Sequence, residues 1–543
     1  MSEWTIAAIF DAVVDKVPDR TMTICGDRRR TFAEVHDRTV RLANFLTASG
    51  LGARYERDSL QDWECGQDRV ALIMHNDLYP DAVIGCLRAR TIPVNVNHYY
   101  TPREVGELLA YIKPTAVIFH RSLGARFAAV LEELAVPVML SIDDDSDAVQ
   151  PFGAIDFDTA LADSDAGNAL MSSPDDLLMM CTGGTTGRPK GVLWRQGDMY
   201  VSSMSGDDHE SIDDVYARVA TVAAPWFALS PLMHAAGMWT AFNAILVGIP
   251  VVVHDSRQPF DARGALEIAE REKVSMMTMV GDAYAAPLIE ELNRHTYDLS
   301  SLAAIGIGGA ATNVKHQQAL LNHLPHITLA NGYGSSETGN MGFGHSQIGD
   351  RKDTFALRAG TVVVSDDYAR FLKAGDTEIG WVARSGRIPL GYFDDQAATQ
   401  SAFRRVEDIR VVIAGDRAQV ESDGTLRLHG RDSLVINTGG EKVFVEEVEE
   451  ALRAHPAVTD ALVVGRPSER WGQEIAALVS LREVVSPVAL REHCAESLAR
   501  FKIPKEIIVV DAVRRLGNGK ADYRWARTAA ALTVPTPTEA TAG

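Results

Sequence analysis

The chain has 543 residues, of which 46% are hydrophobic and 23% charged, and its formal net charge is −20. This length exceeds a single ordinary core, so we expect a large domain built from sublobes together with a smaller one. The acidic balance disfavours binding to nucleic acid and to anionic membranes, and no apolar run reaches membrane-spanning length. An anionic substrate therefore has to be bound by a few well-placed cations.

The first twenty residues carry Glu3 and no basic stretch before their apolar part. That composition argues against a secretory signal and predicts a cytoplasmic protein. The five cysteines are scattered without paired spacing, so we expect neither a disulfide framework nor a zinc site. A homodimer and a peripheral membrane contact are both left open.

Short apolar, β-branched runs alternate with segments of helical period, the clearest runs being residues 70–74, 116–119, 250–253 and 275–280. This alternation predicts α/β architecture with mixed and largely parallel sheets flanked by helices. Two helix starts are legible as capping boxes, Thr31 with Glu34 and Thr101 with Glu104. Residues 53–67 have no clear period and are predicted to be a surface insertion, and the acidic residues 143–147 a solvated loop.

The clearest domain boundary lies at residues 423–431. Beyond it, Val445, Val448 and Leu452 form the apolar face of a predicted helix whose other positions hold Glu446, Glu447, Glu449 and Glu450. We predict a large N-terminal domain over residues 1–430, a small α+β domain over 431–530 and a disordered tail over 531–543.

The stretch MCTGGTTGRPKGVLW, residues 180–194, lies between two apolar runs that predict a hairpin. Its glycines expose backbone N–H groups, its threonines add hydroxyl donors, and Lys190 adds a positive charge, a combination that suits a polyphosphate. Gly191 follows Lys190 where the common G-x-x-x-x-G-K-[ST] motif needs a hydroxyl residue, so that motif is excluded. From composition alone, a flexible surface hairpin is an equally good interpretation.

The wording T-G-G-T-T-G-R-P-K-G resembles the phosphate loop of the adenylate-forming family, which comprises acyl-CoA synthetases, luciferases and the adenylation domains of peptide synthetases. The resemblance implies that the phosphates of ATP contact Thr182, Gly183, Gly184, Thr185, Thr186, Gly187 and Lys190. Gly183 stands where the family has serine, which removes one hydroxyl donor and leaves the backbone N–H.

The family's other motifs follow in the right order, so the resemblance covers nearly the whole chain. It implies an adenine-side loop at Gly308, Gly309 and Ala310, and a second nucleotide segment at Asn331, Gly332, Tyr333, Gly334, Ser335 and Ser336. In that segment Tyr333 offers a flat face to adenine, and Glu337, with Thr182, is the expected ligand of Mg²⁺. Without this context Tyr333 would be a core tyrosine and Glu337 a surface carboxylate.

Three further residues complete the implied ATP site. Asp416 corresponds to the aspartate that accepts hydrogen bonds from the ribose hydroxyls, Arg431 to an arginine at ribose and phosphate, and Lys520 to the catalytic lysine that bridges the carboxylate and the α-phosphate. The alternative for Asp416 is a turn or cap residue. Leu434 replaces the family's hinge aspartate, so the small domain is expected to pivot at Asp432 or Ser433 instead.

The resemblance also implies two half-reactions with CoA as the second substrate. The expected CoA contacts are Gly439, Gly440, Glu441, Lys442, Arg470 and Trp471, where an ordinary surface Arg–Trp pair is the alternative for the last two. His234 corresponds to a residue at the acyl pocket, and with Lys190, Glu337 and Lys520 it completes the expected catalytic set. By itself, a histidine in such an apolar setting is more often a core residue.

Bulky apolar residues surround His234, namely Trp226, Met233, Met238 and Trp239, and they predict a pocket for a large hydrophobic acid. The segments INTGGEKVFVEEVE and GNGKADYRW look most like those of actinobacterial ligases that act in fatty-acid metabolism or in steroid catabolism, on substrates such as cholestenoic acid. Two alternatives stay open: another enzyme of the same fold, such as an aryl-CoA ligase or an adenylate-only enzyme, and a non-catalytic acyl or nucleotide sensor. Pyrophosphate release in the presence of an acid would separate an enzyme from a sensor.

Overall fold

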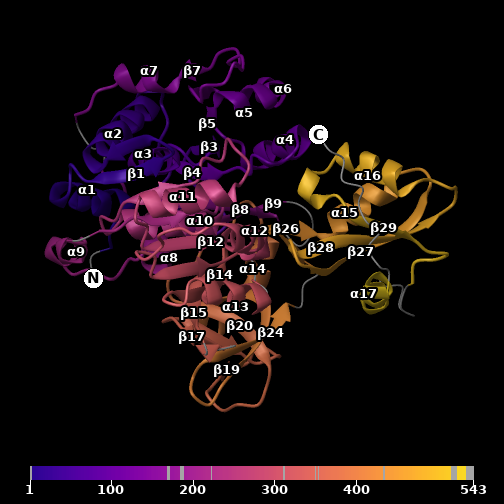
Figure 1. Cartoon of the computed structure of the whole chain (residues 1–543). Coiled ribbons are helices and arrows are strands. Elements are labelled where there is room, and N and C mark those ends of the chain that lie inside the picture. Colours follow the sequence, from indigo (N-terminus) through magenta and orange to yellow (C-terminus); the bar gives the residue numbers. More distant parts are fainter. Residues whose placement is uncertain are drawn as a thin grey trace.

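A computed structural model describes residues 3–167, 171–183, 189–221, 223–309, 312, 314–348, 350–351, 354–431, 435–514 and 522–532. Figure 1 shows a large unit, coloured from indigo to orange, and beside it a smaller unit in orange and yellow. Of the tail predicted to be disordered over 531–543, residues 531 and 532 end a helix, and the rest lies outside the described residues.

The longest sheet runs through the large unit and has sixteen strands among the described residues. One half is parallel apart from its edge strand, and its order is β14 (Thr328–Ser335), β13 (Ala304–Ile307), β12 (Met276–Met279), β10 (Trp226–Ala228), β11 (Val251–Val253), β1 (Thr21–Cys25) and, at the antiparallel edge, β2 (Arg28–Thr31). The other half is antiparallel and continues through β15 (Gly339–Gln347), β17 (Thr354–Leu357), β24 (Leu426–Arg431), β23 (Ile409–Val420), β20 (Gly380–Ser385), β18 (Thr361–Val364) and β19 (Phe371–Leu372). Two short strands pair at its side, β16 (Asp350–Arg351) with β15 and β22 (Phe403–Val406) with β23.

A second sheet of the large unit has eight strands among the described residues. Its order is β21 (Gly391–Tyr392), β9 (Pro189–Arg195), β8 (Leu177–Gly183), β4 (Ile92–Asn95), β3 (Arg69–Ile73), β5 (Ala116–His120), β6 (Val138–Ile142) and β7 (Ile155–Asp156). The strands from β8 to β7 are parallel, whereas β8 and β9 form the predicted antiparallel hairpin.

Helices cover both sheets and bury three apolar clusters. The largest cluster involves α1 (Ile6–Lys16), α2 (Phe32–Ala48), α3 (Tyr79–Arg88), α8 (Gln196–Ser203) and α10 (Ala235–Ile245). A second involves α11 (Ala262–Arg271), α12 (Gly281–Arg294) and α13 (Val314–His323) on the parallel half of the long sheet, and a third α4 (Pro102–Ile112), α5 (Arg121–Arg126) and α6 (Ala128–Glu133) on the second sheet. The remaining helices are short: η1 (Arg57–Ser59), α7 (Phe157–Ala162), α9 (Ile212–Arg218) and α14 (Gln396–Ala402).

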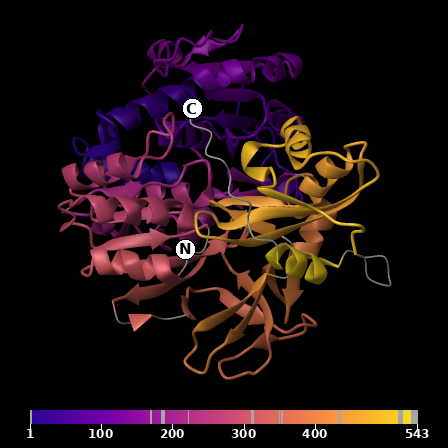
Figure 2. The same cartoon turned by 45° about the vertical axis from the view of Figure 1, so that its right-hand side comes forward.

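The smaller unit is built on a third sheet, in the order β26 (Glu441–Phe444), β25 (Val435–Thr438), β28 (Gly472–Leu481) and β27 (Val458–Ser468), with β29 (Glu506–Val509) parallel to β28. Helices α15 (Val445–Arg453) and α16 (Pro487–Ala495) bury one cluster against this sheet, and α17 (Tyr523–Leu532) buries another. The 3₁₀ turn η2 (Arg500–Lys502) precedes β29. Figure 2 brings this unit forward, with its sheet between α16 and α17.

The predicted fold class is confirmed: a large α/β unit with mixed and parallel sheets is followed by a small α+β unit. Both capping boxes form, because the hydroxyls of Thr31 and Thr101 accept from the backbone N–H of Glu34 and Glu104, whose carboxylates accept in return. Among the described residues no helix combines the length and apolarity that crossing a membrane requires.

Two predictions of solvated acidic residues were wrong at single positions. Asp144, expected in a solvated loop, is buried because its carboxylate accepts hydrogen bonds from the backbone N–H and hydroxyl of Ser122. Glu449, expected on the polar face of α15, is only 3% exposed. Its Oε1 accepts from the backbone N–H of Val463 and from the hydroxyl of Tyr523, both at 2.9 Å.

Candidate active site

The carboxyl ends of parallel strands bring the predicted nucleotide segments together. Gly308 and Gly309 follow β13, and Asn331 to Ser335 lie on the adjacent strand β14, where Ile307 is the register partner of Asn331. Ligands of open α/β sheets bind at such strand ends. Two of the three predicted adenine-side residues are thus neighbours of the second segment, whereas Ala310 lies outside the described residues.

Tyr333 and Asp416 meet although they are far apart in the chain. The hydroxyl of Tyr333 donates to Asp416 Oδ2 at 2.8 Å, from β14 to β23. Asp416 is also the register partner of Arg431 on β24, whose backbone alone is described. The two residues expected at the ribose, Asp416 and Arg431, therefore lie opposite each other on neighbouring strands.

The hairpin of β8 and β9 approaches the same segment from the second sheet. The hydroxyl of Thr182 donates to Glu337 Oε1 at 3.4 Å, and the indole N–H of Trp194 donates to the backbone oxygen of Ser336 at 2.7 Å. Lys190 is opposite Thr182 in the hairpin, with its Nζ 4.9 Å from the ring centre of Tyr392. Gly183 ends β8, and Gly184, Thr185, Thr186 and Gly187 lie outside the described residues.

Glycine is required at the turn around Glu337. A Cβ on Gly334 would lie 2.1 Å from the backbone oxygen of Gly339, and one on Gly339 would lie 2.2 Å from the hydroxyl oxygen of Ser202 in α8. These close approaches fix the turn that carries Glu337 toward Thr182. The carboxylate of Glu337 and the hydroxyl of Thr182 supply oxygen atoms of the kind that Mg²⁺ prefers.

His234 is the N-cap residue of α10, and side chains of the large unit hold the backbone of the two residues before it. The side chain of Asn95 donates to the backbone oxygen of Met233 at 2.8 Å, and Asn76 accepts from the backbone N–H of Leu232 at 2.8 Å. Of the predicted acyl-pocket residues, Met233, Met238 and Trp239 are buried in the largest cluster and Trp226 is half-buried beside it. The indole nitrogen of Trp239 has no hydrogen-bond partner among the described residues.

The smaller unit contributes a carboxylate to His234. Glu441 Oε1 lies 3.0 Å from His234 Nε2, and Glu441 Oε2 accepts from the side-chain amide of Asn97 at 3.1 Å. Burial lowers the pKa of His234, but the attraction of Glu441 outweighs it, so that the pKa is raised overall. Asn97 was not predicted from the sequence, although its position just after the buried strand β4 is a signal that could have indicated it.

The turn that carries Glu441 is a two-residue hairpin of Gly439 and Gly440, whose φ angles are +57° and +86°. Such angles suit glycine in a hairpin turn. A Cβ on Gly440 would lie 2.2 Å from a methyl carbon of Val280 in the large unit, and one on Gly439 would lie 2.9 Å from the indole ring of Trp471. Gly440 thus lets the turn approach the large unit, and Gly439 lets it pack on Trp471 of its own unit.

Cationic side chains gather at Trp471. The guanidinium carbon of Arg470 is 4.6 Å from the ring centre of Trp471, and Lys505 Nζ is 5.8 Å from it. Burial, followed by the like charges of Arg500, Arg470 and Arg491, lowers the pKa of Lys505. Lys442 is the register partner of Asn437 in the hairpin that carries Glu441, whereas Lys520 lies outside the described residues.

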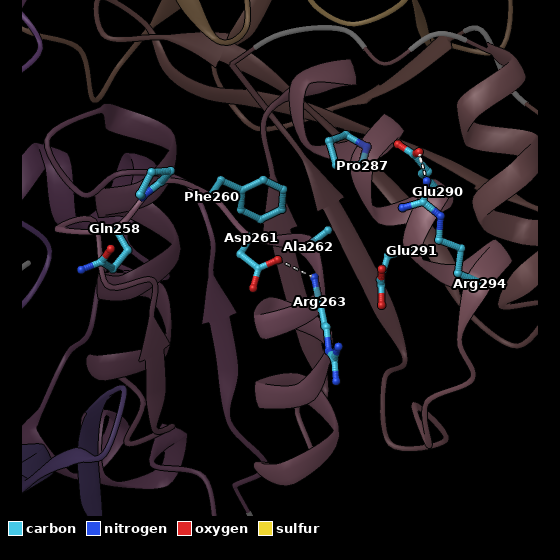
Figure 3. A pocket seen from close by; sticks show the side chains of 10 residues that line it. Gln258, Phe260, Asp261, Ala262, Arg263, Pro287, Glu290, Glu291 and Arg294 are labelled. Carbon is cyan, nitrogen blue, oxygen red and sulfur yellow. Dashed lines mark hydrogen bonds and ion pairs between the residues drawn. The ribbon is translucent and has the colours of Figure 1, made fainter. Parts of the chain in front are cut away.

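A separate cavity of about 590 Å³ opens between the start of α11 and the second half of α12. Figure 3 shows Phe260, Arg263, Pro287, Glu290 and Arg294 among the residues around it. Its arginines have carboxylate partners, Arg263 with Glu267 and Arg294 with Glu290. None of the predicted site residues that the structure describes is among the residues lining this cavity.

Comparisons with known proteins identify the family and the fold of the chain. The model of the AMP-binding enzyme family matches residues 10–372, and that of the AMP-binding enzyme C-terminal domain matches residues 447–520. The amide bond synthetase McbA from Marinactinospora thermotolerans has the same fold, with a TM-score of 0.77 at 22% identity over 97% of this chain and 99% of that one.

Curated relatives span almost the whole chain. The medium-chain acyl-CoA ligase Mig of Mycobacterium avium is 41% identical, covering 96% of this chain and 98% of that protein. The 3-oxocholest-4-en-26-oate–CoA ligase of Rhodococcus rhodochrous is 34% identical, covering 96% and 95%. A medium/long-chain fatty-acid–CoA and 3-oxocholest-4-en-26-oate–CoA ligase of Mycobacterium marinum is 35% identical, covering 96% of both chains. On these matches, the chain belongs to the AMP-binding enzyme family and is an acid–thiol ligase of the AMP-forming acyl-CoA synthetase type.

Proposed function

We propose that the enzyme joins a large hydrophobic acid to CoA through an acyl-adenylate, the acid being a medium- or long-chain fatty acid or a sterol side-chain acid. The names of the relatives, which are 34–41% identical, support this range of acids. The apolar side chains of Met233, Met238 and Trp239 beside His234 support a hydrophobic acid over a polar one.

In the first half-reaction the acid's carboxylate oxygen attacks the α-phosphorus of ATP, and pyrophosphate leaves. Negative charge grows on the departing group, so fixed donors and cations stabilise the transition state. We assign that role to Lys190, Lys520 and the backbone of residues 182–187. Asp416 and Tyr333 bind the ribose and the adenine, Arg431 binds ribose and phosphate, and the glycines near Gly308 let the nucleotide approach the backbone.

Glu337 and Thr182 would hold Mg²⁺, which supplies positive charge to the phosphates when bound. Their oxygen atoms fit this ion. Among the described residues no group of three histidine, cysteine or carboxylate side chains could hold a metal ion. That fits a magnesium ion bound by few protein oxygens and by substrate phosphates, which is its usual coordination.

In the second half-reaction the CoA thiol attacks the acyl carbonyl, the thiol proton is lost, and AMP leaves with the bridging oxygen. The observation that carries the proposal is the contact of Glu441 with His234 and Asn97, because it brings the Gly439–Gly440 turn beside the predicted acyl pocket. We assign this turn, with Glu441 and Lys442, to the pantetheine arm, and Arg470 and Trp471 to the CoA nucleotide. We also propose that the small domain, from residue 431 to 530, moves between the two half-reactions.

An acid panel tests the proposal. Purified enzyme would be incubated with ATP and Mg²⁺, with and without CoA, and with octanoate, palmitate, a cholestenoate or indoleacetate, and pyrophosphate, AMP and thioester would be measured. We expect pyrophosphate with each preferred hydrophobic acid and thioester only with CoA. Release of pyrophosphate without any thioester would indicate an adenylate-only enzyme, and no release with any acid would favour a sensor.

A further inference from the structure

Lys502 belongs to the smaller unit, in η2, but its ammonium group lies against the large unit. Nζ is 2.8 Å from Glu104 Oε1 of α4 in the large unit and 2.9 Å from Glu447 Oε2 of α15 in the smaller one. Lys502 is only 6% exposed. Lysine is almost never buried unless it is paired, so the two carboxylates account for its position.

Aromatic rings from both units enclose this charge. Nζ of Lys502 is 4.7 Å from the ring centre of Tyr100, and the ring of Phe501 stacks on that of Tyr100 at 6.4 Å. Burial works against the charged ammonium, yet Tyr100, Glu447 and Glu104 raise the pKa of Lys502 overall. The lysine therefore stays charged at neutral pH, and its ion pairs are shielded from water.

The carboxylate of Glu104 has two tasks, one for each oxygen. Oε2 accepts from the backbone N–H and the hydroxyl of Thr101 in the capping box of α4, at 2.8 and 2.9 Å. Oε1 forms the ion pair with Lys502. Because the capping box fixes the side chain within the large unit, Glu104 is oriented for Lys502 without help from the smaller unit.

The segment of the large unit that contains Tyr100 and Glu104 also contacts Glu441. Asn97, which donates to Glu441, precedes Tyr100 and Glu104 by a few residues. The smaller unit thus contacts residues 97–104 at two points, through Glu441 and through Lys502. The carboxylates of Glu104 and Glu447 both bind Lys502 Nζ. Without that charge they would face each other across the two units and repel each other.

We propose that Lys502 is a positioning residue for thioester formation: its ion pair with Glu104 holds the smaller unit where Glu441 reaches Asn97 and His234. The inference rests on the proposed function, because the second half-reaction needs this docked arrangement. Adenylate formation does not need it, so the two half-reactions should respond differently.

The decisive variant is Glu104→Gln in the full-length enzyme. Glutamine at this position still completes a capping box, so the start of α4 is preserved while the charge facing Lys502 is removed. We expect acid-dependent exchange of pyrophosphate into ATP to stay within about twofold of wild type, and conversion of preformed acyl-adenylate to thioester to slow by about tenfold or more. The matched control is Glu107→Gln on the same helix, an exposed residue paired with Arg103, and it should leave both rates unchanged.

Substitutions of the lysine give a second, independent measurement. Lys502→Met keeps the apolar stem but loses the charge, so it should slow the thioester step. Lys502→Arg keeps the charge, so its thioester step should be closer to the wild-type rate. Equal loss in both half-reactions, or an unchanged thioester step in Glu104→Gln, would overturn the proposal.

Hydrogen exchange keeps this test separate from the proposed function. If the wild-type enzyme released no pyrophosphate with any acid, the proposed function would fail, but docking could still be measured. Glu104→Gln should then increase amide exchange in residues 437–444 relative to Glu107→Gln. Equal exchange in the two variants would refute the positioning role.

Discussion

Glu441 Oε1 lies 3.0 Å from His234 Nε2, so a carboxylate of the smaller unit contacts the residue that precedes α10 in the large unit. The two residues are 207 positions apart in the chain. Because Glu441 also accepts a hydrogen bond from Asn97, it joins the hairpin turn to two parts of the large unit. It is the geometric link between the predicted acyl pocket and the predicted CoA loop.

Glu441→Gln should slow thioester formation and spare adenylate formation. The substitution keeps the shape and the hydrogen bond from Asn97 but removes the charge that attracts His234. We expect the rate of the thioester step to fall by about tenfold. Single-turnover assays of each half-reaction provide the measurement, with Glu483→Gln, an exposed residue of the smaller unit, as control. A matching loss in adenylate formation would contradict the role assigned to this contact.

The thioester step should also depend on pH through His234. Its pKa is raised by Glu441, so the attraction is fully present below the ordinary histidine pKa of about 6.5 and is lost as pH rises through the raised value. We expect the wild-type rate of the thioester step to decline as the pH rises from about 6.5 through the raised pKa of His234, and the rate of Glu441→Gln to vary less. Identical pH profiles for the two enzymes would count against the pairing.

Asp416→Asn should weaken ATP binding. In the proposed site the carboxylate accepts two ribose hydroxyls, and an amide has only one accepting oxygen, so the KM for ATP should rise by about tenfold or more. Tyr333→Phe removes the 2.8 Å hydrogen bond that orients Asp416 and should raise the same KM by a smaller factor. The KM for CoA should not change. A variant with normal ATP saturation would exclude Asp416 from the ribose site.

Local patterns allowed much of the fold to be predicted from sequence. The capping boxes at Thr31 and Thr101 and the pairing of β8 with β9 depend on residues close together in the chain, and all three form as expected. Contacts such as Lys502 with Glu104 join residues 398 positions apart, and no local spacing indicates them. The burial of Glu449 likewise depends on Tyr523, which arrives from a later helix.

The family resemblance supplied the residues of the proposed nucleotide site, and their binding roles stay predictions. The structure shows that the sheets bring Thr182 to Glu337 and Tyr333 to Asp416. The resemblance did not indicate Asn97, because its role depends on the register of β4 and on the docked position of Glu441.

A cluster of buried histidines should make the protein sensitive to acid. Burial, followed by the neighbouring His75, lowers the pKa values of His98 and His120 to about 3. Between pH 6.5 and 3 each of these histidines is protonated in the unfolded chain but neutral in the folded one. Each therefore lowers the free energy of unfolding by about 1.4 kcal/mol for every pH unit that the pH falls.

His98→Asn tests this sensitivity, because an asparagine amide can still donate to the backbone oxygen of Met74 as His98 Nδ1 does. Between pH 7 and 5, urea unfolding should show the variant losing about 2 kcal/mol less than wild type. The exposed control His323→Asn should behave like wild type. If His98→Asn loses as much as wild type, His98 does not cause the acid sensitivity.

The most direct measurement of the proposed reaction uses dodecanoate labelled with ¹⁸O in both carboxylate oxygens. Attack of this carboxylate on the α-phosphorus places one labelled oxygen between the acyl group and AMP, and the thiol then displaces AMP with that oxygen. Mass spectrometry of the products should find AMP carrying one ¹⁸O and a thioester carrying the other. Unlabelled AMP, or ADP and phosphate in its place, would contradict an acyl-adenylate intermediate.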